Sequence, residues 1–405
     1  MILKHLSLSN LRLFSWLDED LPAGLLLLEG ENAQGKTSLL EAIHYLATLS
    51  SFRASSDRQL INLLAVQSRE SVAVARLVAD YVRDERAHHM EVRLIIEPNG
   101  SPDGRFRREV LLDGVRRSTQ EALGNFLAVL FSPAMTQIIE GEPEARRRYL
   151  DGIISQASRP YSQALGVYQQ VLSQRNALLK RLAEGDGDAG ELAYWDEMLS
   201  EQGALLIQER IRAIQELEAL ARRVYYELSA EQEVLRLVYQ PAYDPLPMPA
   251  GQFTLRLSDP IDRSGLSYDD IRQGFQRRLG ALRAEEIRRG MTTTGPHRDE
   301  LRLLSNGTDL GIYGSRGQIR LALLALKLAE VGWLKQRTGS WPILLLDEAL
   351  AELDEPHRRQ LLRHVAGYEQ AILTSAEPDG DRDEALRGAV RWRIAEGKIS
   401  TLAPS

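Results

Sequence analysis

The chain has 405 residues, with 50 Lys and Arg against 57 Asp and Glu, so its formal net charge is −7. Its hydrophobic content of 43% and charged content of 26% are ordinary for globular proteins and exclude wholesale disorder. The absence of cysteine excludes a disulfide framework, a zinc finger and a thiol nucleophile. No apolar run reaches the roughly 18 residues of a membrane span, and the first residues lack a signal-peptide core. We therefore expect a cytoplasmic protein without a membrane partner.

The first part of the chain predicts an α/β structure. Residues 1–13 alternate as a strand does, residues 25–29 form a short buried strand that ends at glycine, and residues 37–49 have helical spacing. Further strands are expected around residues 72–83, 90–97 and 109–115, with turns at Pro98–Gly100 and Asp113-Gly114.

The middle of the chain changes to long amphipathic helices. Apolar residues recur at helical spacing from Tyr161 to Leu217, interrupted by a turn at residues 184–190. These stripes indicate helix-on-helix packing, and a short coiled-coil arm is the sharper alternative.

The last part of the chain returns to a mixed pattern. A proline-rich loop over residues 241–249 precedes a charged helix over residues 268–289 and a hairpin over residues 300–313 around Asn306-Gly307. A helix over about residues 319–331, a strand at 342–346, a helix at 355–367 and a strand at 370–374 follow. We divide the chain into residues 1–140, 141–232 and 233–405, with the middle segment as a helical subdomain inserted into an α/β head.

A complete phosphate-binding sequence lies near the start. Residues 30–37 fit G-x-x-x-x-G-K-[ST], follow a predicted strand and open a predicted helix. Lys36 would reach the β and γ phosphates of a nucleotide, and the Thr37 hydroxyl would ligate Mg²⁺. The alternative is a glycine-rich turn that binds nothing. The residues expected around the phosphates are Gly30, Glu31, Asn32, Ala33, Gln34, Gly35, Lys36, Thr37 and Ser38.

A second acidic motif follows the apolar strand at Ile343–Leu346. Asp347 would hold the metal, directly or through water, and Glu348 would polarise the attacking water. Alone this pattern is equally typical of acids that begin a helix, but the phosphate loop makes the catalytic interpretation the stronger one.

A third motif precedes the helix that begins near Ile319. Ser315, Gly317 and Gln318 resemble the Ser-x-Gly-Gln signature of ABC-type ATPases, which contacts the nucleotide held by the opposite subunit, although Ser315 alone is also typical of a helix cap. Glu352-Leu353-Asp354 resembles the D-loop of the same class. Nearly the whole chain separates the phosphate loop from these motifs, which is the split-head plan of chromosome-maintenance ATPases.

The chain resembles the RecF-type DNA repair and recombination ATPases over most of its length. Asn10-Leu11-Arg12 stands where the family has its Asn-x-Arg, which makes Arg12 a nucleotide-contacting residue by resemblance. The other matching segments are Leu39–Ile43, Ser51–Arg53, Phe131–Pro133, Ile138–Asp151, Arg175–Lys180, Thr294–Asp299 and Leu353-Asp354.

The chain also departs from the family pattern. Ala134 and Glu142 replace residues that are usually an acid and a small residue or Asp, respectively, and Glu348 stands where the family often has Asp. Thr374-Ser375 occupy the place of the switch histidine of many ABC ATPases, and Gln137 is the candidate for their Q-loop glutamine. With Lys36 and Glu348, Gln137 completes the expected catalytic set.

The resemblance implies an ABC-type ATPase head with an inserted helical arm. It also implies an activity: Mg·ATP-dependent homodimerisation on duplex DNA and single/double-strand junctions. Slow, DNA-stimulated hydrolysis and help in loading recombinase with RecO- and RecR-type partners, within replication, recombinational repair and the SOS response, belong to the same expectation. Arginines that could contact DNA phosphates are Arg53, Arg105, Arg107, Arg108, Arg116 and Arg117, although each alone is typical of a solvated face.

Two other classes stay open. A transporter ATPase subunit would have a much shorter middle segment, and a binding scaffold would use ATP only as a conformational latch. A coiled-coil nuclease partner would need long heptads and usually a cysteine hook, and the chain has neither.

Overall fold

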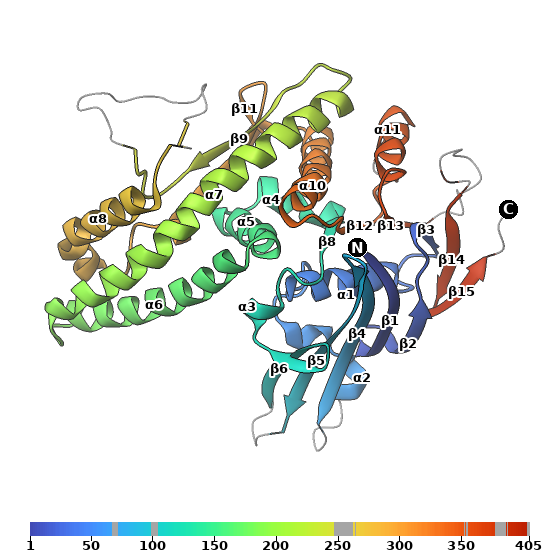
Figure 1. The fold of residues 1–405 in the computed structure, drawn as a ribbon, viewed down its shortest axis with the longest axis horizontal. Coiled ribbons are helices and arrows are strands. Elements are labelled where there is room, and N and C mark those ends of the chain that lie inside the picture. The colour runs from blue at the N-terminus through green and yellow to red at the C-terminus, as the bar shows by residue number, and fades with distance from the viewer. Residues whose placement is uncertain are drawn as a thin grey trace. The chain divides into compact units, whose positions relative to one another are not determined.

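The structure is a computed structural model, and it divides into two compact units. It describes residues 1–66, 72–98, 104–246, 262–263, 265–351, 353, 355–376, 386 and 388–402. The first unit combines residues 1–135 with residues 327–405, and the second comprises residues 136–326. The contacts within the structure thus define two units. The three segments expected from the sequence, with boundaries after residues 140 and 232, stay a prediction. Figure 1 shows the order of the elements.

One six-stranded sheet of the first unit is antiparallel. Its strands follow the order β2 (Phe14–Asp20), β1 (Ile2–Leu11), β4 (Ala73–Arg83), β5 (Arg86–Glu97), β6 (Arg105–Leu112) and β7 (Val115–Arg117). In the central strand β4, Ala73, Ala75, Leu77, Ala79 and Tyr81 are buried at alternate positions, as is usual for a sheet with one face against a core.

The other six-stranded sheet is mixed and joins the two ends of the chain. Its order is β15 (Lys398–Leu402), β14 (Val390–Ala395), β3 (Gly24–Glu29), β13 (Gln370–Ser375), β12 (Ile343–Leu346) and β8 (Ala128–Phe131). All neighbouring pairs are parallel except β14 with β15. The continuous apolar runs in β8 and β12 arise because parallel strands are covered on both faces.

Helix α1 (Lys36–Thr48) packs between the two sheets. It contacts β8 and β13 of the mixed sheet and β4 of the antiparallel sheet, and eleven of its thirteen residues are buried. The position of α1 in this core fixes the residues that precede it. The shorter elements of this unit are η1 (Asp57–Leu60), α2 (Leu63–Val66), α3 (Thr119–Ala122), η2 (Pro133–Thr136) and α11 (Glu355–Val365).

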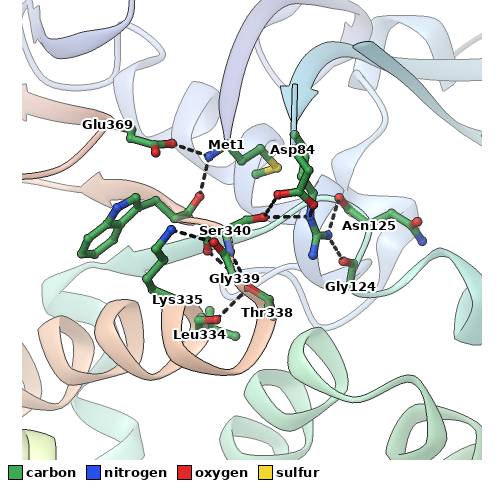
Figure 2. A network of polar contacts seen from close by, with 12 residues as sticks. Met1, Asp84, Gly124, Asn125, Leu334, Lys335, Thr338, Gly339, Ser340 and Glu369 are labelled. Carbon is green, nitrogen blue, oxygen red and sulfur yellow. Dashed lines mark hydrogen bonds and ion pairs between the residues drawn. The ribbon is translucent and has the colours of Figure 1, made fainter. Parts of the chain in front are cut away.

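A polar network joins the two sheets at the end where β1 begins. Figure 2 shows the Ser340 hydroxyl donating to Asp84 in the turn between β4 and β5, at 2.9 Å. The N-terminal ammonium of Met1 donates to the Trp341 carbonyl and the Glu369 carboxylate, at 3.0 and 2.6 Å. The segment that leads into β12 is therefore held against the antiparallel sheet.

The second unit is largely helical. Its long helices are α5 (Pro143–Ala157), α6 (Arg159–Ala183), α7 (Leu192–Leu228) and α8 (Tyr268–Arg289). A small antiparallel sheet has the order β11 (Thr308–Asp309), β10 (Glu300–Ser305) and β9 (Leu235–Gln240). The short elements are α4 (Gln137–Glu140), η3 (Ala189–Glu191), η4 (Pro296–Arg298) and α9 (Leu310–Tyr313). Helix α10 (Arg316–Thr338) runs across the division, since its residues from Lys327 onward belong to the first unit.

Two arginines neutralise buried carboxylates in the core of the second unit. Arg210 bonds Asp299 at 2.8 Å and Asp151 at 2.7 Å. Arg175 bonds Asp196 and Glu286, each at 2.8 Å. These pairs join α5, α6, α7, α8 and the segment after η4 by charge as well as by apolar packing.

The expected mixed α/β head and the helical middle segment are confirmed. The helix expected over residues 268–289 is α8 without change. The hairpin over residues 300–313 is shorter than expected, because residues 310–313 form helix α9, which the Asp309 side chain caps by accepting from the Gly311 N–H at 2.9 Å. In the described part of the chain, no helix is long and apolar enough to cross a membrane.

Candidate nucleotide-binding site

The phosphate loop, residues 30–35, connects β3 to α1 and is closely packed. A Cβ on Gly30 would lie 2.4 Å from the Ile394 carbonyl oxygen, and one on Gly35 would lie 3.2 Å from the Phe14 ring. Gly35 also has a φ of 115°. Both positions therefore require glycine, and the loop backbone is held by neighbouring strands.

The Lys36 ammonium is held inside this loop. It donates to the carbonyl oxygens of Gly30 and Glu31, at 2.6 and 2.9 Å. Burial lowers the pKa of Lys36, while the nearby carboxylates of Glu348 and Asp347 oppose this effect. The side chain is thus positioned at the start of α1, where a helix N-terminus already favours an anion.

The Asp347 carboxylate lies where several strands end. It accepts hydrogen bonds from the hydroxyl groups of Thr37 at 3.0 Å, Thr374 at 3.1 Å and Ser132 at 3.2 Å. Its partners are thus neutral, although Asp347 is only 5% exposed. A carboxylate beside a threonine hydroxyl is a donor set that Mg²⁺ prefers when phosphate oxygens and water complete the coordination.

Protein groups alone do not form a metal cage here. Among the described residues, no group of three or more His, Cys, Asp or Glu side chains is arranged to hold a metal ion. Thr37 and Asp347 therefore fit a metal that a nucleotide brings with it.

Glu348 has an unusual backbone conformation. Its φ of 49° lies in the left-handed region, which costs a non-glycine residue about 1–2 kcal/mol. Its N–H donates to the Thr374 hydroxyl at 2.8 Å, so one threonine contacts both acids of the motif. Strain of this kind gathers at functional sites.

A pocket opens over these groups. Its volume is about 380 Å³, and it is lined by Leu13, Asn32, Ala33, Gly35, Lys36, Thr37, Ser38, Arg53 and Glu348. A second pocket of about 280 Å³ shares Leu13, Ser38 and Arg53 and adds Arg12 and Gln59. The pocket thus extends from the phosphate loop toward the turn between β1 and β2.

Two arginines lie beside this pocket. Arg12 makes a two-pronged ion pair with the buried Glu41, at 2.9 and 2.8 Å, and also donates to the Gln59 carbonyl at 2.9 Å. The exposed Arg53 lines both pockets. Arg53 was expected to contact DNA, and its surroundings favour a nucleotide contact instead.

The remaining residues expected to contact nucleotide are placed differently. The Gln34 side chain accepts from the Glu396 N–H at 2.6 Å, and Glu31 offers its carbonyl to Lys36. Gln137 begins α4 in the second unit and is exposed. Asp354 lies outside the described residues, as does Glu352.

The signature residues cap helix α10. The Gln318 N–H donates to the Ser315 hydroxyl at 3.2 Å, and the Ser315 N–H donates to the Gln318 side chain at 3.1 Å, which forms a reciprocal cap. Gln318 also donates to Glu233 at 3.1 Å. Ser315 and Gly317 are exposed, so the cap leaves this helix end accessible.

The arginines of the antiparallel sheet fall into two groups. Arg108 points inward, where it donates to the Asp57 carboxylate at 3.1 Å and the Thr119 hydroxyl at 3.0 Å, so we assign it a structural role. Arg105, Arg116 and Arg117 are exposed, and Arg107 is partly exposed and paired with Glu97 and Glu109.

Comparison with known proteins shows the family to which the chain belongs. The family described as RecF/RecN/SMC N terminal domain matches residues 2–380. The DNA replication and repair protein RecF of Thermomicrobium roseum is 37% identical over 402 residues, which cover 98% of this chain and 99% of that protein. The chain belongs to the RecF family.

Further relatives support the assignment to the RecF family. The RecF protein of Roseiflexus castenholzii is 38% identical over 98% of this chain and 99% of its own length. A solved structure of the recombination mediator protein RecF with ATP, from the RecFOR pathway, has a TM-score of 0.81 at 28% identity and 99% coverage of both chains. The Smc head domain of Pyrococcus furiosus has a TM-score of 0.50 at 15% identity, covers 99% of this chain and 96% of its own, and shows a shared fold alone.

Two residues of the site were not assigned from the sequence. Ser132 and Thr374 both donate to Asp347, and Thr374 was noted only as the residue in place of a switch histidine. Their one signal is their place at the carboxyl end of an apolar strand, since Ser132 follows β8 and Thr374 is near the end of β13, and the carboxyl ends of parallel strands meet at one edge.

Proposed function

We propose that this RecF-family chain binds Mg·ATP in the pocket over the phosphate loop, hydrolyses it slowly and closes as a homodimer on duplex DNA during recombinational repair. The observation that supports this most is the 3.0 Å hydrogen bond between Thr37 and Asp347. It joins two motifs 310 residues apart, in the arrangement that a phosphate-bound magnesium ion requires.

Each group of the pocket has a defined role in this proposal. Lys36 leaves the loop carbonyls and pairs with the β and γ phosphates, while loop N–H groups hold the rest. Thr37 and Asp347 hold Mg²⁺, which when bound neutralises the charge that develops on the phosphates. Glu348 orients the attacking water and accepts its proton, and Thr374 keeps the two acids in register.

In this proposal Arg12 and Arg53 contact the nucleotide, because they line the pockets beside the phosphate loop. Arg12 pairs with Glu41, whose carboxylate is shielded from solvent because the Glu41 side chain is only 2% exposed. Within the part of the chain that the structure describes, the Arg53 guanidinium group has no ion-pair partner and can turn toward a phosphate, while the Arg53 backbone N–H donates to the Ser51 hydroxyl at 3.0 Å.

The signature supports a role across a dimer. Ser315, Gly317 and Gln318 of one copy would cover ATP in the pocket of a second copy, with Asp354 and Gln137 as further contacts. Ser315 and Gly317 are exposed at the N-terminus of α10, which supports this role. A phosphate group of the ATP bound to the second copy can approach this helix end.

The outer face of the antiparallel sheet is the proposed DNA surface. Strand pairing and alternation place five arginines on this face: Arg76, Arg93, Arg105, Arg107 and Arg116. Of the arginines expected from the sequence, Arg108 and Arg117 alternate to the opposite face. Arg76 and Arg93 share Glu91, and the hydrogen bond from Arg76 to this carboxylate, aided by Arg93, lowers the pKa of Glu91 to about 2. Glu91 thus stays ionised and holds two guanidinium groups toward solvent.

The cellular setting follows from the relatives. The relatives are called DNA replication and repair proteins, and a solved RecF structure is described as belonging to the RecFOR pathway. We therefore propose RecO- and RecR-type partners, gapped or junction DNA as the substrate, and a cytoplasmic location.

The proposal is tested by two titrations. Labelled ATP should bind the wild type but not Lys36→Ala, while Lys335→Ala, a lysine of α10 that bonds Gly339 away from the pocket, should bind normally. Normal ATP binding by Lys36→Ala would refute the site.

The second titration follows the anisotropy of labelled duplex DNA with and without Mg·ATP at two salt concentrations. Binding should tighten with ATP, and Arg105→Ala should lower the slope of log K against log salt by about 1. Arg223→Ala, an 82% exposed arginine of α7, is the matched control. If the protein bound no DNA with or without Mg·ATP at either salt concentration, the proposed ATPase activity would stand and the proposed DNA clamp would be refuted.

A further inference from the structure

The C-terminal hairpin lies against the phosphate loop. Strands β14 and β15 are joined by a two-residue turn at Glu396-Gly397, and both residues have positive φ, 50° and 72°. This conformation is typical of the tight turns that close twisted hairpins. The chain returns here to a loop that it formed more than 360 residues earlier.

The backbone of this turn holds Gln34. The Glu396 N–H donates to the Gln34 side-chain oxygen at 2.6 Å, and the Gly397 N–H donates to the Gln34 carbonyl at 3.3 Å. Both oxygens of one loop residue are therefore bound to consecutive N–H groups of the turn. This fixes Gln34 immediately before Gly35 and Lys36.

Steric contacts hold the loop on either side of Gln34. The Ile394 carbonyl packs so closely on Gly30 that no Cβ fits between them, and the Ile394 side chain lies 3.8 Å from the Cβ position of Gly35. Phe14 packs on the same glycine at 3.2 Å. The loop is thus enclosed between β14 and the turn after β1.

An ion pair holds the strand that enters the loop. Arg391 of β14 donates to the Glu29 carboxylate at 3.0 Å through Nε, and the Glu29 side chain is only 6% exposed. Removing this arginine would leave a buried carboxylate without its cation, next to Gly30.

We propose that the β14–β15 hairpin is a brace that sets the conformation of the phosphate loop, and that Gln34, Glu396 and Arg391 are positioning residues for nucleotide binding. Gln34 acts through the hairpin rather than on phosphate. The brace keeps the loop N–H groups aimed at the phosphate position before ATP arrives, which lowers the ordering cost of binding. This inference rests on the proposed ATP site and adds residues to it.

The first experiment compares two substitutions in the turn. Glu396→Pro removes the N–H that Gln34 accepts and cannot adopt a φ of 50°, whereas Glu396→Asn keeps both. We expect labelled ATP to bind Glu396→Pro about tenfold more weakly and Glu396→Asn as the wild type does. Arg393→Met, an exposed arginine on the same strand, is the control for strand substitutions.

A second variant covers the case in which Glu396→Pro prevents the hairpin from folding. Gln34→Met has a similar shape without the acceptor and leaves the hairpin sequence intact. Gln34→Met should weaken ATP binding to a similar extent, and the double variant Gln34→Met/Glu396→Pro should be little worse than either alone. Additive losses would mean that the two residues act separately and would overturn the brace.

The nucleotide-free protein gives an independent readout. Amide hydrogen exchange over residues 30–38 should be faster in Gln34→Met and Glu396→Pro than in the wild type. If the wild type binds no ATP, the proposed function fails, but exchange still tests the brace. The brace would be refuted if the folded variants bound ATP with the affinity of the wild type and their residues 30–38 exchanged amide hydrogens at the wild-type rate.

Discussion

Two buried aspartates, one in each unit, have opposite surroundings. Asp347 is 5% exposed and accepts from three neutral hydroxyl groups, whereas Asp299 is 1% exposed and pairs with Arg210 at 2.8 Å. Asp299 also accepts from the Tyr239 hydroxyl and from the Ala242 N–H at 2.9 Å. The charge of Asp299 is balanced within the chain, and that of Asp347 is available to a cation from outside.

This difference separates two kinds of sequence motif. Asp299 stands in a segment by which the chain resembles its family, and Asp347 stands in the acidic motif that follows the strand Ile343–Leu346. In the segment Thr294–Asp299, Pro296, His297 and Asp299 bond to neighbouring helices and strands, and Arg298 alone has an exposed side chain. Asp299, which pairs with a cation of the chain, stabilises the fold, whereas Asp347, which accepts from hydroxyl groups, can bind a cation at the site.

The largest effect is expected on turnover. Asp347→Asn should lower Mg²⁺-dependent ATP hydrolysis by about 10²–10³-fold, because a preorganised charge at the transferred phosphate is lost. The unfolding midpoint in urea should stay close to that of the wild type, since the amide oxygen can still accept from Thr37 and Thr374 while the amide NH₂ donates to the Ser132 hydroxyl. A large loss of stability in Asp347→Asn would show that Asp347, like Asp299, mainly stabilises the fold.

The reverse pattern is expected for Asp299→Asn. Losing one partner of a buried ion pair should lower the free energy of unfolding by about 3 kcal/mol, as measured by urea denaturation. ATP affinity at a temperature where the variant is folded should not change. Asp309→Asn, an aspartate near the surface of the same unit that caps α9, provides the comparison for a milder loss.

An exposed motif of the second unit should behave as a site. Ser315→Arg places a bulky cation at the N-terminus of α10 and should weaken ATP-dependent dimerisation by about a hundredfold, seen by light scattering, because the long side chain fills the space that the partner's nucleotide needs and a cation is unfavourable at a helix N-terminus. ATP binding to the single chain should persist. Thr308→Arg, at an exposed position of β11 close to α9, is the control, and equal dimerisation of both variants would argue against the signature.

The smallest effect concerns pH. Burial lowers the pKa of His297 to about 4, while an unfolded histidine titrates near about 6.5. Between these values only the unfolded chain binds the proton, so acid should destabilise the protein in this window. In His297→Gln, the stability lost between pH 7 and pH 5 should be smaller by about 2 kcal/mol. An unchanged difference would mean that His297 does not titrate in this way.

Local patterns were sufficient for the elements that contain the site. The strand before Gly30, the helix after it and the strand before Asp347 each have their own apolar pattern, so residues 30–38 and Asp347 could be placed from the sequence. Helix α9 was missed because the Asp309 cap ends β11 after two residues, and an N-terminal cap within a hairpin pattern is a weak signal.

Contacts across the chain could not be predicted in the same way. Ser132 and Thr374 reach Asp347 only because β8, β12 and β13 are neighbours in the mixed sheet. The β14–β15 hairpin lies in a part of the sequence for which no element was expected, and its contact with Gln34 depends on a backbone N–H rather than on a side chain. No pattern of residue types records such a contact.

The mixed sheet places β3, from the first thirty residues, between β13 and β14, from the last forty. A ribosome that synthesises this chain therefore releases the phosphate loop long before the strands that flank it exist. The loop must wait, without its neighbours, for almost the entire time of synthesis. An interrupted chain cannot complete the pocket, so incomplete copies would not compete with finished ones for ATP.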